Sequence, residues 1–545
     1  MQKFILFLGI FLTPLVSNAQ TFEPQSPLDI PLVLSGTFAE LRSNHFHGGI
    51  DIKTQGRSGL KVYSVADGYV SRIAVSPYGY GNALYIRHPE GYTTVYGHLN
   101  AFSPAIEDWV ENQFRDRSKN DGNLYPAADQ FPVAKGEFVA FSGNTGGSMG
   151  PHLHFEIRDT RSEEPLNPLE FGLKVKDTRK PDIRGLMWTS EDFSDAGLFN
   201  AGDTVAMPHA KGFDLFTTDK QDGANNNNGV YAIEASADGQ IFFTANYRRI
   251  NFNTSRFINA HVNFERYYSQ GVRYTRLYEL DNNPLEVTNT WELTTPAFRA
   301  TKGWLTVAKD SVVTIEVSVR DYDGNQSAFQ FYLKGTESLP EAPKPEQTRW
   351  NVDNVLENGA VHVFLPSGAL YHDAVFDLVQ LANENYIIGE GNALQTYMTI
   401  TWDLDSIQRT KVGWFLWEIG RKGSKDAISG TREGDQMVFE TRSTGKYYLD
   451  QDLQKPTVSI VSRTPSARPN SDFRQLLVRA ADDKTGIDRY SARIDGAFAR
   501  IDFDYKQELL KVIVPKDIPA GNHNLRVVVI DGVGNTTVEE YDITL

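Results

Sequence analysis

Histidine is distributed unevenly along this chain of 545 residues. Six of its 11 histidines lie between residues 45 and 154, and the other five are scattered over the remainder. Two of the six occur in His152–Ile157, where polar and apolar residues alternate as in a strand that is buried on one side. The alternation sends His152 and His154 to the same face of such a strand. Two imidazoles placed in this way can bind one metal ion or one substrate atom, although a half-exposed surface pair has the same pattern.

Two further segments carry a histidine in a setting that suits chemistry. His47 and Asp51 are separated by residues 48–50, which begin with two glycines, and these allow the backbone to turn tightly enough for the imidazole and the carboxylate to converge. His98 follows the strand-like run Tyr92–Val95. Taken singly, both signals are weak, because a histidine four residues before an aspartate is common and a lone histidine is more often structural than catalytic.

Taken together, these segments can form a metal site. The chain contains no cysteine, which excludes disulfides, thiolate zinc sites, iron–sulfur clusters and a cysteine nucleophile. Catalytic zinc commonly takes three protein ligands from histidine and carboxylate side chains and leaves a fourth position for water. His47, Asp51 and one histidine of the pair His152 and His154 can supply these ligands. The other member of the pair and His98 are then free to handle protons beside the metal.

The residues around these positions resemble one known family, the lysostaphin/LytM-type zinc metallopeptidases, which cut peptide bridges in bacterial cell walls. The similar segments occur in the family's order and cover about residues 40–170: Arg42–Asp51 (RSNHFHGGID), Val65–Val70 (VADGYV), Tyr78–Asn82 (YGYGN), Thr94–Leu99 (TVYGHL), Lys135–Gly146 and Pro151–Ile157 (PHLHFEI). The resemblance implies that His47, Asp51 and His154 bind one Zn²⁺ ion and that His98 and His152 serve catalysis. It also implies a compact antiparallel β-domain with a groove over the metal.

Other catalytic patterns fit the sequence less well. Gly146–Gly150 satisfies the G-x-S-x-G pattern of serine hydrolases, but that motif needs a strand before it and a helix after it. The strand with two histidines follows almost at once, so we expect a glycine-rich loop. No H-E-x-x-H sequence occurs, which excludes the commonest helical zinc-protease site. His45 has no role that the family implies, beyond a contact behind the ligands, and His88, next to Pro89, is expected to be exposed.

Most of the chain that must position these residues is predicted to be β-structure. Short runs of β-branched and aromatic residues alternate with Gly, Asn and Asp turns. The predicted fold class is mainly β: an antiparallel β-sheet LytM-like peptidase domain followed by about three immunoglobulin-like β-sandwich units. One segment differs, because Ser103-Pro104 is typical of a helix N-terminus and apolar residues then recur at helical spacing up to Phe114. We expect residues 101–131 to be an inserted helix and loop that walls the groove, acts as a lid or is a solvated excursion.

The N-terminus has the features of a signal peptide. Lys3 is followed by the apolar run Phe4–Val16 and by Ser17-Asn18-Ala19, a small-x-small cleavage site. The run is shorter than the roughly 20 residues of a membrane-spanning helix. We expect residues 1–19 to be removed from an exported protein that is periplasmic or associated with the cell envelope and has no transmembrane segment. The remainder divides into a peptidase domain (20–174), a β-sandwich (175–336), a proline-rich linker (337–347), a sandwich-like domain (348–452) and a last β-sandwich (453–545).

An internal repeat relates two of these units. Lys180-Pro181 is echoed by Lys455-Pro456, and each unit has a turn of the same type near its end, Asp321–Asn325 and Asp531–Asn535. We expect two copies of one antiparallel sandwich. Asp321–Asn325 can also begin a calcium loop, since oxygen ligands at alternate positions suit that ion. The downstream glutamate of such a loop is missing, and a tight hairpin turn is the better prediction.

Charge and compartment narrow the function. The 69 acidic and 54 basic residues give a net charge of −15, and nucleic acid as a partner is disfavoured because it needs a basic surface. Together with the predicted export, the resemblance to the lysostaphin/LytM-type family implies an exported zinc metalloendopeptidase that hydrolyses peptide cross-links of peptidoglycan through a zinc-activated water, with D-alanyl–diaminopimelate bonds or glycine bridges as the target. The sandwich domains are available to bind an envelope protein partner. The alternative is a non-catalytic or autoinhibited wall-binding regulator or scaffold that activates or positions another hydrolase.

Overall fold

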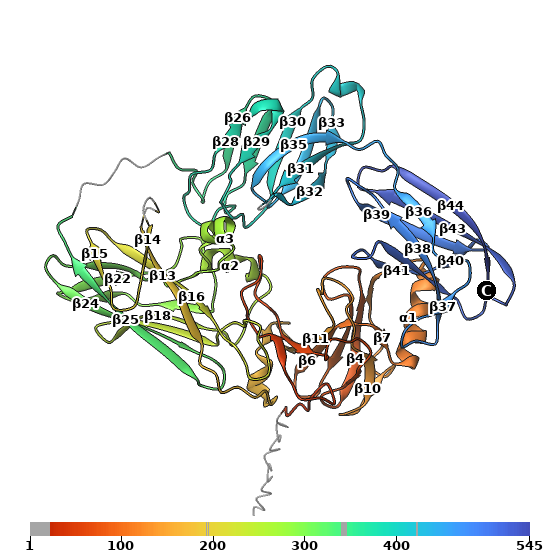
Figure 1. Ribbon diagram of the computed structural model, residues 1–545, viewed down its shortest axis with the longest axis horizontal. Helices are drawn as coiled ribbons and strands as arrows, with labels where there is room; N and C mark the ends of the chain where they lie inside the picture. Colours follow the sequence, from red (N-terminus) through yellow and green to blue (C-terminus); the bar gives the residue numbers. More distant parts are fainter. Residues whose placement is uncertain (1–21, 192, 194–195, 339–345, 421–422) are drawn as a thin grey trace, which may run out of the picture.

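The computed structural model describes residues 22–191, 193, 196–338, 346–420 and 423–545. The chain folds into four β-rich domains that follow one another around a ring, so that the last domain lies beside the first (Figure 1). The fold is mainly β and its strand pairs are nearly all antiparallel. The predicted signal peptide lies outside the described residues, as does most of the proline-rich linker. No helix in the described part of the chain is long and apolar enough to cross a membrane.

The N-terminal domain is built on one large sheet with a small sheet beside it. The large sheet has the order β1-β2-β11-β6-β5-β4-β8, with β12 added to β11 and β9 to β4, and the small sheet has the order β3-β10-β7. The strands are β1 (Leu34–Gly36), β2 (Ile50–Lys53), β3 (Lys61–Tyr63), β4 (Gly68–Val75), β5 (Asn82–Arg87), β6 (Tyr92–Leu99), β7 (Ala101–Phe102), β8 (Gly122–Leu124), β9 (Pro132–Val133), β10 (Phe138–Phe141), β11 (His152–Asp159) and β12 (Pro165–Leu166), with a 3-10 turn at Pro168–Phe171.

The second domain is a sandwich of two sheets. One sheet has the order β14-β13-β16-β23-β22-β21 with β19 added to β16, and the other has the order β15-β25-β24-β17-β18-β20. The elements are β13 (Asp182–Ser190), β14 (Ala196–Phe199), β15 (Thr204–Met207), β16 (Lys211–Thr218), β17 (Ala232–Ala237), β18 (Gln240–Asn246), a 3-10 turn (Ser255–Phe257), α2 (Ile258–His261), α3 (Phe264–Gln270), β19 (Thr275–Arg276), β20 (Thr288–Thr290), β21 (Leu293–Thr294), β22 (Phe298–Thr301), β23 (Trp304–Val307), β24 (Val312–Arg320) and β25 (Gln326–Gly335).

The third domain also has two sheets, of five strands each, and its core is separate from those of its neighbours. The sheet orders are β26-β27-β30-β34-β33 and β28-β29-β35-β31-β32. The elements are β26 (Asn354–Asn358), β27 (Val361–Leu365), β28 (Leu378–Gln380), a 3-10 turn (Ala382–Glu384), β29 (Tyr386–Ile388), β30 (Met398–Asp403), a 3-10 turn (Gln408–Thr410), β31 (Trp414–Ile419), β32 (Lys425–Ser429), β33 (Thr431–Glu433), β34 (Gln436–Thr441) and β35 (Gly445–Gln451).

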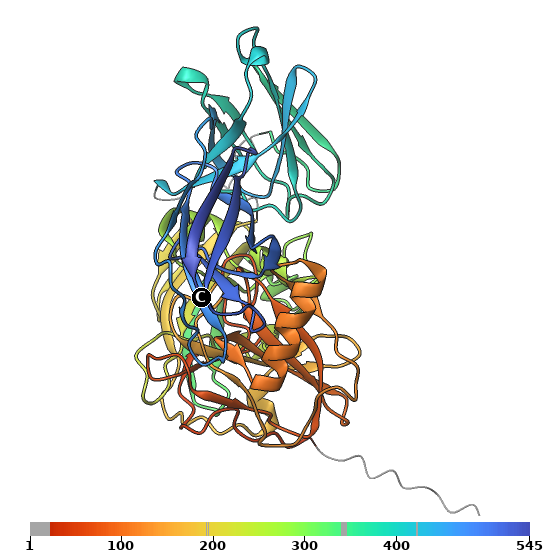
Figure 2. The same ribbon diagram turned by 90° about the vertical axis from the view of Figure 1, so that its right-hand side faces the viewer.

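The fourth domain pairs a sheet of order β36-β38-β42-β41, with β37 added to β38, with a sheet of order β40-β39-β43-β44. Its strands are β36 (Thr457–Ile460), β37 (Ser466–Ala467), β38 (Arg474–Ala481), β39 (Ile487–Ile494), β40 (Ala497–Ala499), β41 (Ile501–Asp504), β42 (Leu509–Val514), β43 (Asn522–Asp531) and β44 (Thr536–Thr544). Figure 2 shows this domain between the third domain at one end of the molecule and the N-terminal domain at the other.

The repeated turns of the second and fourth domains make matching contacts. Asn325 donates from its backbone N and its Nδ2 to the two carboxylate oxygens of Asp321, at 2.9 and 2.7 Å, and Asn535 does the same to Asp531 at 2.8 and 2.7 Å. Both turns join antiparallel strand pairs, β24–β25 and β43–β44. The predicted hairpin turn at Asp321 is therefore present, and the shared contacts agree with the predicted repeat.

The N-terminal and second domains share one apolar core. A single cluster of buried side chains runs from the first domain into the second, whereas the third and fourth domains have clusters of their own. At the junction, Phe46 is 1 % exposed and its ring lies 5.9 Å from that of His261 and 6.4 Å from that of Tyr247. Because burying such a ring is worth roughly 2–3 kcal/mol, the first two domains stabilise each other.

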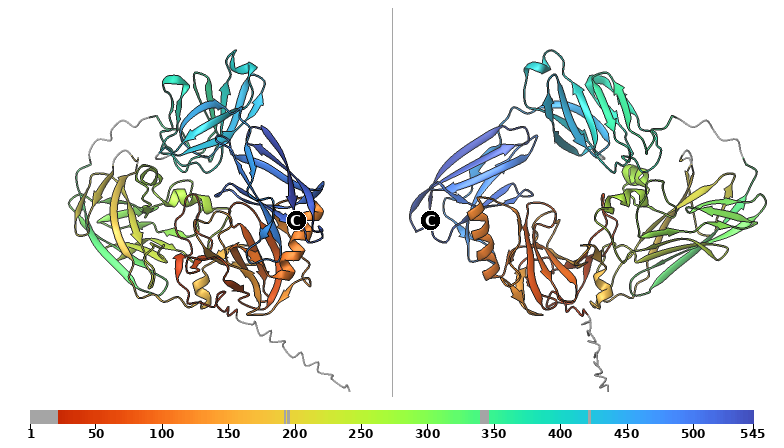
Figure 3. Two further views of the ribbon diagram at one scale, coloured as in Figure 1. Left: turned by 45° about the vertical axis from the view of Figure 1, so that its right-hand side comes forward. Right: turned by 180° about the vertical axis from the view of Figure 1, so that it is seen from behind.

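The inserted helix is present as α1 (Pro104–Arg117), with Ser103 at its N-cap position. Ile106, Val110 and Phe114 face the core, as their spacing predicts. The other side of α1 is covered by the fourth domain, as Figures 1 and 3 show from opposite sides, and Glu107 and Glu111 are only 4 and 6 % exposed. The alternative of a solvated excursion is therefore wrong for the helix, which is the surface on which the ring closes, whereas residues 127–130 of the following loop are exposed.

Candidate metal and catalytic site

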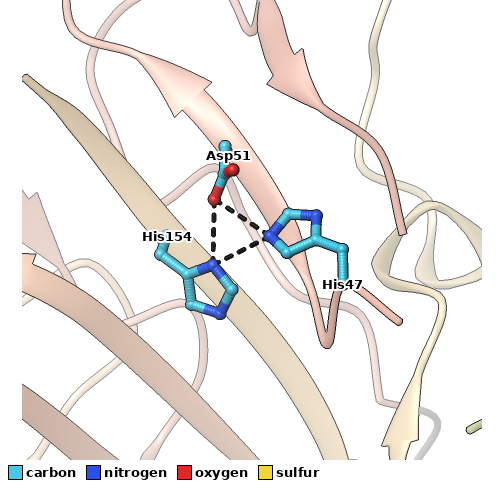
Figure 4. A group of neighbouring side chains, drawn as sticks. All are labelled: His47, Asp51 and His154. Carbon is cyan, nitrogen blue, oxygen red and sulfur yellow. Dashed lines mark hydrogen bonds and ion pairs between the residues drawn. The ribbon is translucent and has the colours of Figure 1, made fainter. Parts of the chain in front are cut away.

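Three of the predicted residues meet beside β2 and β11, two neighbouring strands inside the large sheet. Asp51 lies on β2 and His154 on the neighbouring strand β11, where the antiparallel register places the two residues opposite each other. His47 reaches the same point from the loop before β2 (Figure 4). His47 Nε2 lies 3.1 Å from Asp51 Oδ1 and 3.0 Å from His154 Nδ1, and His154 Nδ1 lies 2.9 Å from Asp51 Oδ1. All three side chains are buried.

Glycine is required in the loop that carries His47. A Cβ atom on Gly49 would lie 2.3 Å from the carbonyl oxygen of Phe155, and one on Gly48 would lie 2.9 Å from a carboxylate oxygen of Glu156. Only a residue without a side chain can bring the backbone this close to β11. The second domain supports the same loop, because Ser255 Oγ accepts a hydrogen bond from the backbone N of Phe46 at 3.1 Å.

The hydrogen bonds of the two imidazoles fit a metal site. His47 Nδ1 donates to the carbonyl oxygen of Thr37 at 2.7 Å, and His154 Nε2 donates to Glu156 Oε1 at 2.8 Å. In the neutral form of each ring, these bonds leave the lone pairs on His47 Nε2 and His154 Nδ1, and both face the carboxylate of Asp51. Burial alone would lower the pKa of His154, but Asp51 and Glu156 raise it to about 9, so a metal ion bound there would displace a proton. Three electron-pair donors converge on one point, about 3 Å apart, close to the roughly 3.3 Å that separates ligand atoms around a tetrahedral zinc ion. The donor set and its geometry therefore fit zinc.

His98 and His152 lie beside this point. Their rings are 4.7 Å apart, and the ring of His98 is 5.8 Å from that of His154. Each Nδ1 donates to a carbonyl oxygen at 2.8 Å, that of Thr145 for His98 and that of Gly150 for His152, which leaves each Nε2 without its hydrogen in the neutral ring. His152 Nε2 is buried with no hydrogen-bond partner among the described residues and lies 3.4 Å from Asp51 Oδ1. The structure thus brings all five predicted residues together.

Burial keeps two of the imidazoles neutral. It lowers the pKa of His47 to about 4, although Asp51 opposes the shift, and it lowers the pKa of His98 to about 3 with help from His154 and His152. A neutral imidazole is the form that binds a metal or accepts a proton. Neutral rings at physiological pH suit both roles.

A set of buried polar side chains surrounds the ligands and was not predicted. Glu156 accepts from the hydroxyl of Tyr80 and from Nε of Arg158, both at 2.6 Å, in addition to His154. Burial alone would raise the pKa of Glu156, but Arg158 and His154 hold it at about 2, so the carboxylate is ionised. On the other side, Arg42 Nη2 donates to Asp51 Oδ2 at 2.5 Å and leaves Oδ1 for the metal position. Tyr80, Glu156 and Arg42 all lie inside the segments that resemble the family, which was the available signal.

Replacing Glu156 by Gln is expected to weaken zinc binding by about 10- to 100-fold, the usual effect of removing a charged partner behind a metal-bound histidine. Glutamine can still accept the hydrogen bond of His154 but no longer offers a negative charge that increases the basicity of the ring. A competition titration with a chromophoric chelator measures the change. Glu163→Gln is the matched control. The Glu163 side chain is exposed, and it contacts Arg158 weakly, through one carboxylate oxygen that lies 3.7 Å from Nη1. Equal affinity in both variants would contradict this role of Glu156.

Two further histidines of the N-terminal domain, His88 and His45, are not part of the candidate site. The prediction that His88 is exposed is wrong: it is 2 % exposed and bonds through its two ring nitrogens to the carbonyl of Asp67 and the hydroxyl of Thr94, both at 2.8 Å. Its neighbour Pro89 suggested a surface turn, but the ring itself turns inward. His45 is exposed and its only hydrogen bond among the described residues is to the carbonyl of Ser43, so it makes no hydrogen bond to a ligand. Residues 146–150 form the expected loop and not a strand–helix turn.

Comparisons with known proteins find matches for the first domain and for the third. Residues 45–113 match the model of Peptidase family M23, and residues 345–452 match that of the Zu5-like domain. The chain is 34% identical over 142 residues to the DD-carboxypeptidase/endopeptidase Mpg of Neisseria meningitidis, covering 26% of each chain, and 34% identical over 111 residues to the peptidoglycan DD-endopeptidase ShyB of Vibrio cholerae, covering 20% of each. It therefore spans about a quarter or less of the length of these relatives.

Solved structures that are similar to part of this chain are also found. The catalytic domain of lysostaphin from Staphylococcus simulans is 21% identical and covers 26% of this chain and 91% of its own, with a TM-score of 0.20. The segments matched in the named relatives are short enough to correspond to a single domain. The N-terminal domain of this chain thus contains the segment that matches Peptidase family M23, and further β-rich domains follow it.

Proposed function

We propose that the N-terminal domain is a zinc metalloendopeptidase of the bacterial cell wall. The observation that carries the proposal is the convergence of His47 Nε2, Asp51 Oδ1 and His154 Nδ1 within 3.1 Å of one another, while the other nitrogen of each ring is hydrogen-bonded elsewhere. Zinc bound there would lower the pKa of a bound water towards about 7 and polarise the scissile carbonyl.

His98 and His152 are the residues that we assign to catalysis. Their hydrogen-bonded Nδ1 atoms fix the rings, and the free Nε2 atoms can accept a proton from the attacking water or, once protonated, donate to the oxyanion of the tetrahedral intermediate. The short separation of the two rings, 4.7 Å, allows them to share these tasks on one substrate. Either order of the two roles is compatible with this geometry.

We further propose that the substrate is the cross-linked peptide of peptidoglycan and that the protein acts in the periplasm or at the cell envelope after export. The relatives are named as DD-carboxypeptidase/endopeptidase and as peptidoglycan DD-endopeptidase. These names favour D-alanyl–diaminopimelate bonds over glycine bridges.

A second function is favoured by one specific set of contacts: restriction of access to the site by the fourth domain. Lys506 Nζ donates to the carbonyl oxygens of Asn144 and Ser148, at 2.6 and 3.0 Å, in the glycine-rich loop that precedes His152. The ring of Tyr505 in the fourth domain also lies 5.1 Å from that of Tyr78, in the loop between β4 and β5. We propose that the ring-closed protein is an autoinhibited form and that opening of the ring admits the wall. This combines the catalytic prediction with part of the regulatory alternative.

Digestion of purified cross-linked peptidoglycan tests the proposal. The zinc-loaded protein, residues 20–545, is expected to convert cross-linked dimers into monomers, and mass spectrometry of the fragments identifies the cleaved bond. Chelation before the assay is expected to stop the reaction, and re-addition of zinc to restore it. A zinc-loaded protein that leaves the cross-links intact even when the fourth domain is undocked would contradict the peptidase assignment.

A further inference from the structure

A second cluster of candidate ligands lies where the chain passes from the N-terminal domain into the second domain. Carboxylate oxygens of Asp177, Asp219 and Asp321 all lie within 4.8 Å of one another. Val175, just before the cluster, still pairs with Leu32 of the first domain. Asp219 directly follows β16 and Asp321 directly follows β24, so the cluster joins the connecting segment to both sheets of the second domain.

One carboxylate of the cluster lacks a partner that a buried carboxylate needs. Asp321 accepts from Asn325, and Asp177 accepts from the backbone N of Arg179 at 3.0 Å, but Asp219 is different. Asp219 is 3 % exposed, and its Oδ1 has no hydrogen-bond partner among the described residues. Among all the described residues, no lysine or arginine nitrogen lies within ion-pair distance of any of the three carboxylates. Two residues further on, Gln221 is also 3 % exposed, and its Oε1 has no partner either. An uncompensated buried carboxylate is costly, and a cation or a proton is needed beside it.

The electrostatics of the cluster point the same way. Burial, with the charges of Asp177 and Asp321, raises the pKa of Asp219 to about 7, and burial raises the pKa of Asp177 to about 6. The charges of Asp323 and Asp222 also raise the pKa of Asp177, and the charge of Asp321 raises that of Asp323. Several acidic groups therefore repel one another, and the exposed Lys176 nearby pairs with Asp222 at 3.6 Å and not with the three clustered carboxylates.

We propose that Asp177, Asp219 and Asp321 bind one Ca²⁺ ion, which fastens the segment that leaves the peptidase domain to the second domain. The ligand atoms are all oxygens, which calcium prefers, and ligands on opposite sides of a calcium ion lie roughly 5 Å apart, compatible with the observed separation. The imidazole and carboxylate set around His154 suits zinc, so the two sites differ in ligand type.

The fourth domain offers a matched comparison. Asp452, Asp482 and Asp531 form a cluster of the same kind before and after corresponding strands. Here the carboxylates have partners: Asp482 Oδ1 accepts from the backbone N atoms of residues 484, 485 and 486 at 2.8–3.1 Å, and Asp452 Oδ2 accepts from the hydroxyl of Thr485 at 2.9 Å. The structure assigns the cation to the first cluster, because only there is a buried cluster oxygen left without a donor in the described residues.

Calcium titration of the full chain tests this assignment. The protein is first loaded with zinc to fill the imidazole site, and Ca²⁺ binding is then measured by calorimetry. One Ca²⁺ per chain is expected, with affinity reduced at least about 10-fold in Asp219→Asn, since the number of ligand charges sets the affinity of calcium sites. Asp482→Asn, the matched control, is expected to bind as the unchanged protein does. Terbium luminescence excited through tyrosine gives a second readout, because Tyr322 adjoins Asp321.

Stability in calcium-free buffer separates loss of a ligand from loss of the fold. Without calcium, Asp219→Asn removes one of three repelling carboxylates, so its unfolding temperature is expected to equal or exceed that of the unchanged protein, whereas added Ca²⁺ no longer raises it. Asp177→Asn, at a half-buried position, provides the same comparison if Asp219→Asn does not fold. Absence of calcium binding in the unchanged protein would overturn the proposal, and so would binding that survives both substitutions. Either result leaves the zinc peptidase assignment intact.

Discussion

Replacement of His154 or Asp51 by alanine will remove zinc binding and peptidase activity together. Each side chain supplies one of the three protein atoms that converge on the metal position, and His154 is the link between that position and the buried Glu156. With two ligands left, the site loses most of its affinity, and the remaining activity should equal that of the chelated protein. Zinc content by atomic absorption and cross-link cleavage measure the two losses on the same samples.

His45→Ala is the control for this experiment. His45 lies two residues before His47 but is exposed, and its hydrogen bond goes to the carbonyl of Ser43, so zinc content and activity should be unchanged. His98→Ala and His152→Ala should separate the two properties: zinc stays bound, while the rate falls by about 10²- to 10⁴-fold, the usual contribution of a general acid or base. A His152→Ala protein of normal rate would refute its catalytic role, and loss of zinc from it would make His152 a ligand.

The sequence predicted the parts of this site that depend on local spacing. Two-residue alternation placed His152 and His154 on one face of β11, and the pair of glycines allowed His47 to approach Asp51; the structure has both features. The strands and α1 were predictable for the same reason, since periodicity and turn residues act over a few positions. What surrounds the ligands depends on residues far apart in the chain, and no local pattern distinguishes Glu156 as a partner of His154 from an ordinary strand residue.

Long-range pairing also explains what was missed elsewhere. Asp177 and Asp219 are polar residues in turn-like segments, and only the packing of two strands brings them to Asp321. Glu107 and Glu111 occupy positions that, on an amphipathic helix, normally face solvent. Their partners lie in the fourth domain, more than 350 residues later in the chain. Composition and periodicity carry no information about such pairs.

The contacts of Glu111 give the second large effect. Arg500 donates to Glu111 from Nε at 2.7 Å and from Nη2 at 2.6 Å, and Arg468 donates to Glu111 at 3.2 Å as well as to Glu107. Both arginines are buried, with 4 and 6 % of their surface exposed. Removal of one member of a buried ionic network typically costs about 3–5 kcal/mol, because the remaining charges are left uncompensated.

Glu111→Ala is therefore expected to undock the fourth domain from α1 and to increase cleavage of cross-linked peptidoglycan. Undocking withdraws Lys506 from the loop beside His152, while the ligands of the first domain stay in place. Small-angle scattering measures the opening of the ring, and fragment release from whole sacculi measures activity. Truncation near residue 175 would be a poorer test, because it also removes the second domain, which packs on Phe46 and holds the loop of His47.

Asp108→Ala provides the matched control for the ring-opening experiment. Asp108 also lies on α1 and pairs across the same interface, with Lys516 Nζ at 2.6 Å, but half of its side chain is exposed. Exposed pairs contribute about 0–1 kcal/mol, so this variant should stay closed and keep the basal rate. If Glu111→Ala opens the ring and activity falls instead of rising, the fourth domain presents the wall to the site and does not cover it. Since both outcomes require the ring to open, scattering and activity together decide between restriction and delivery of the substrate.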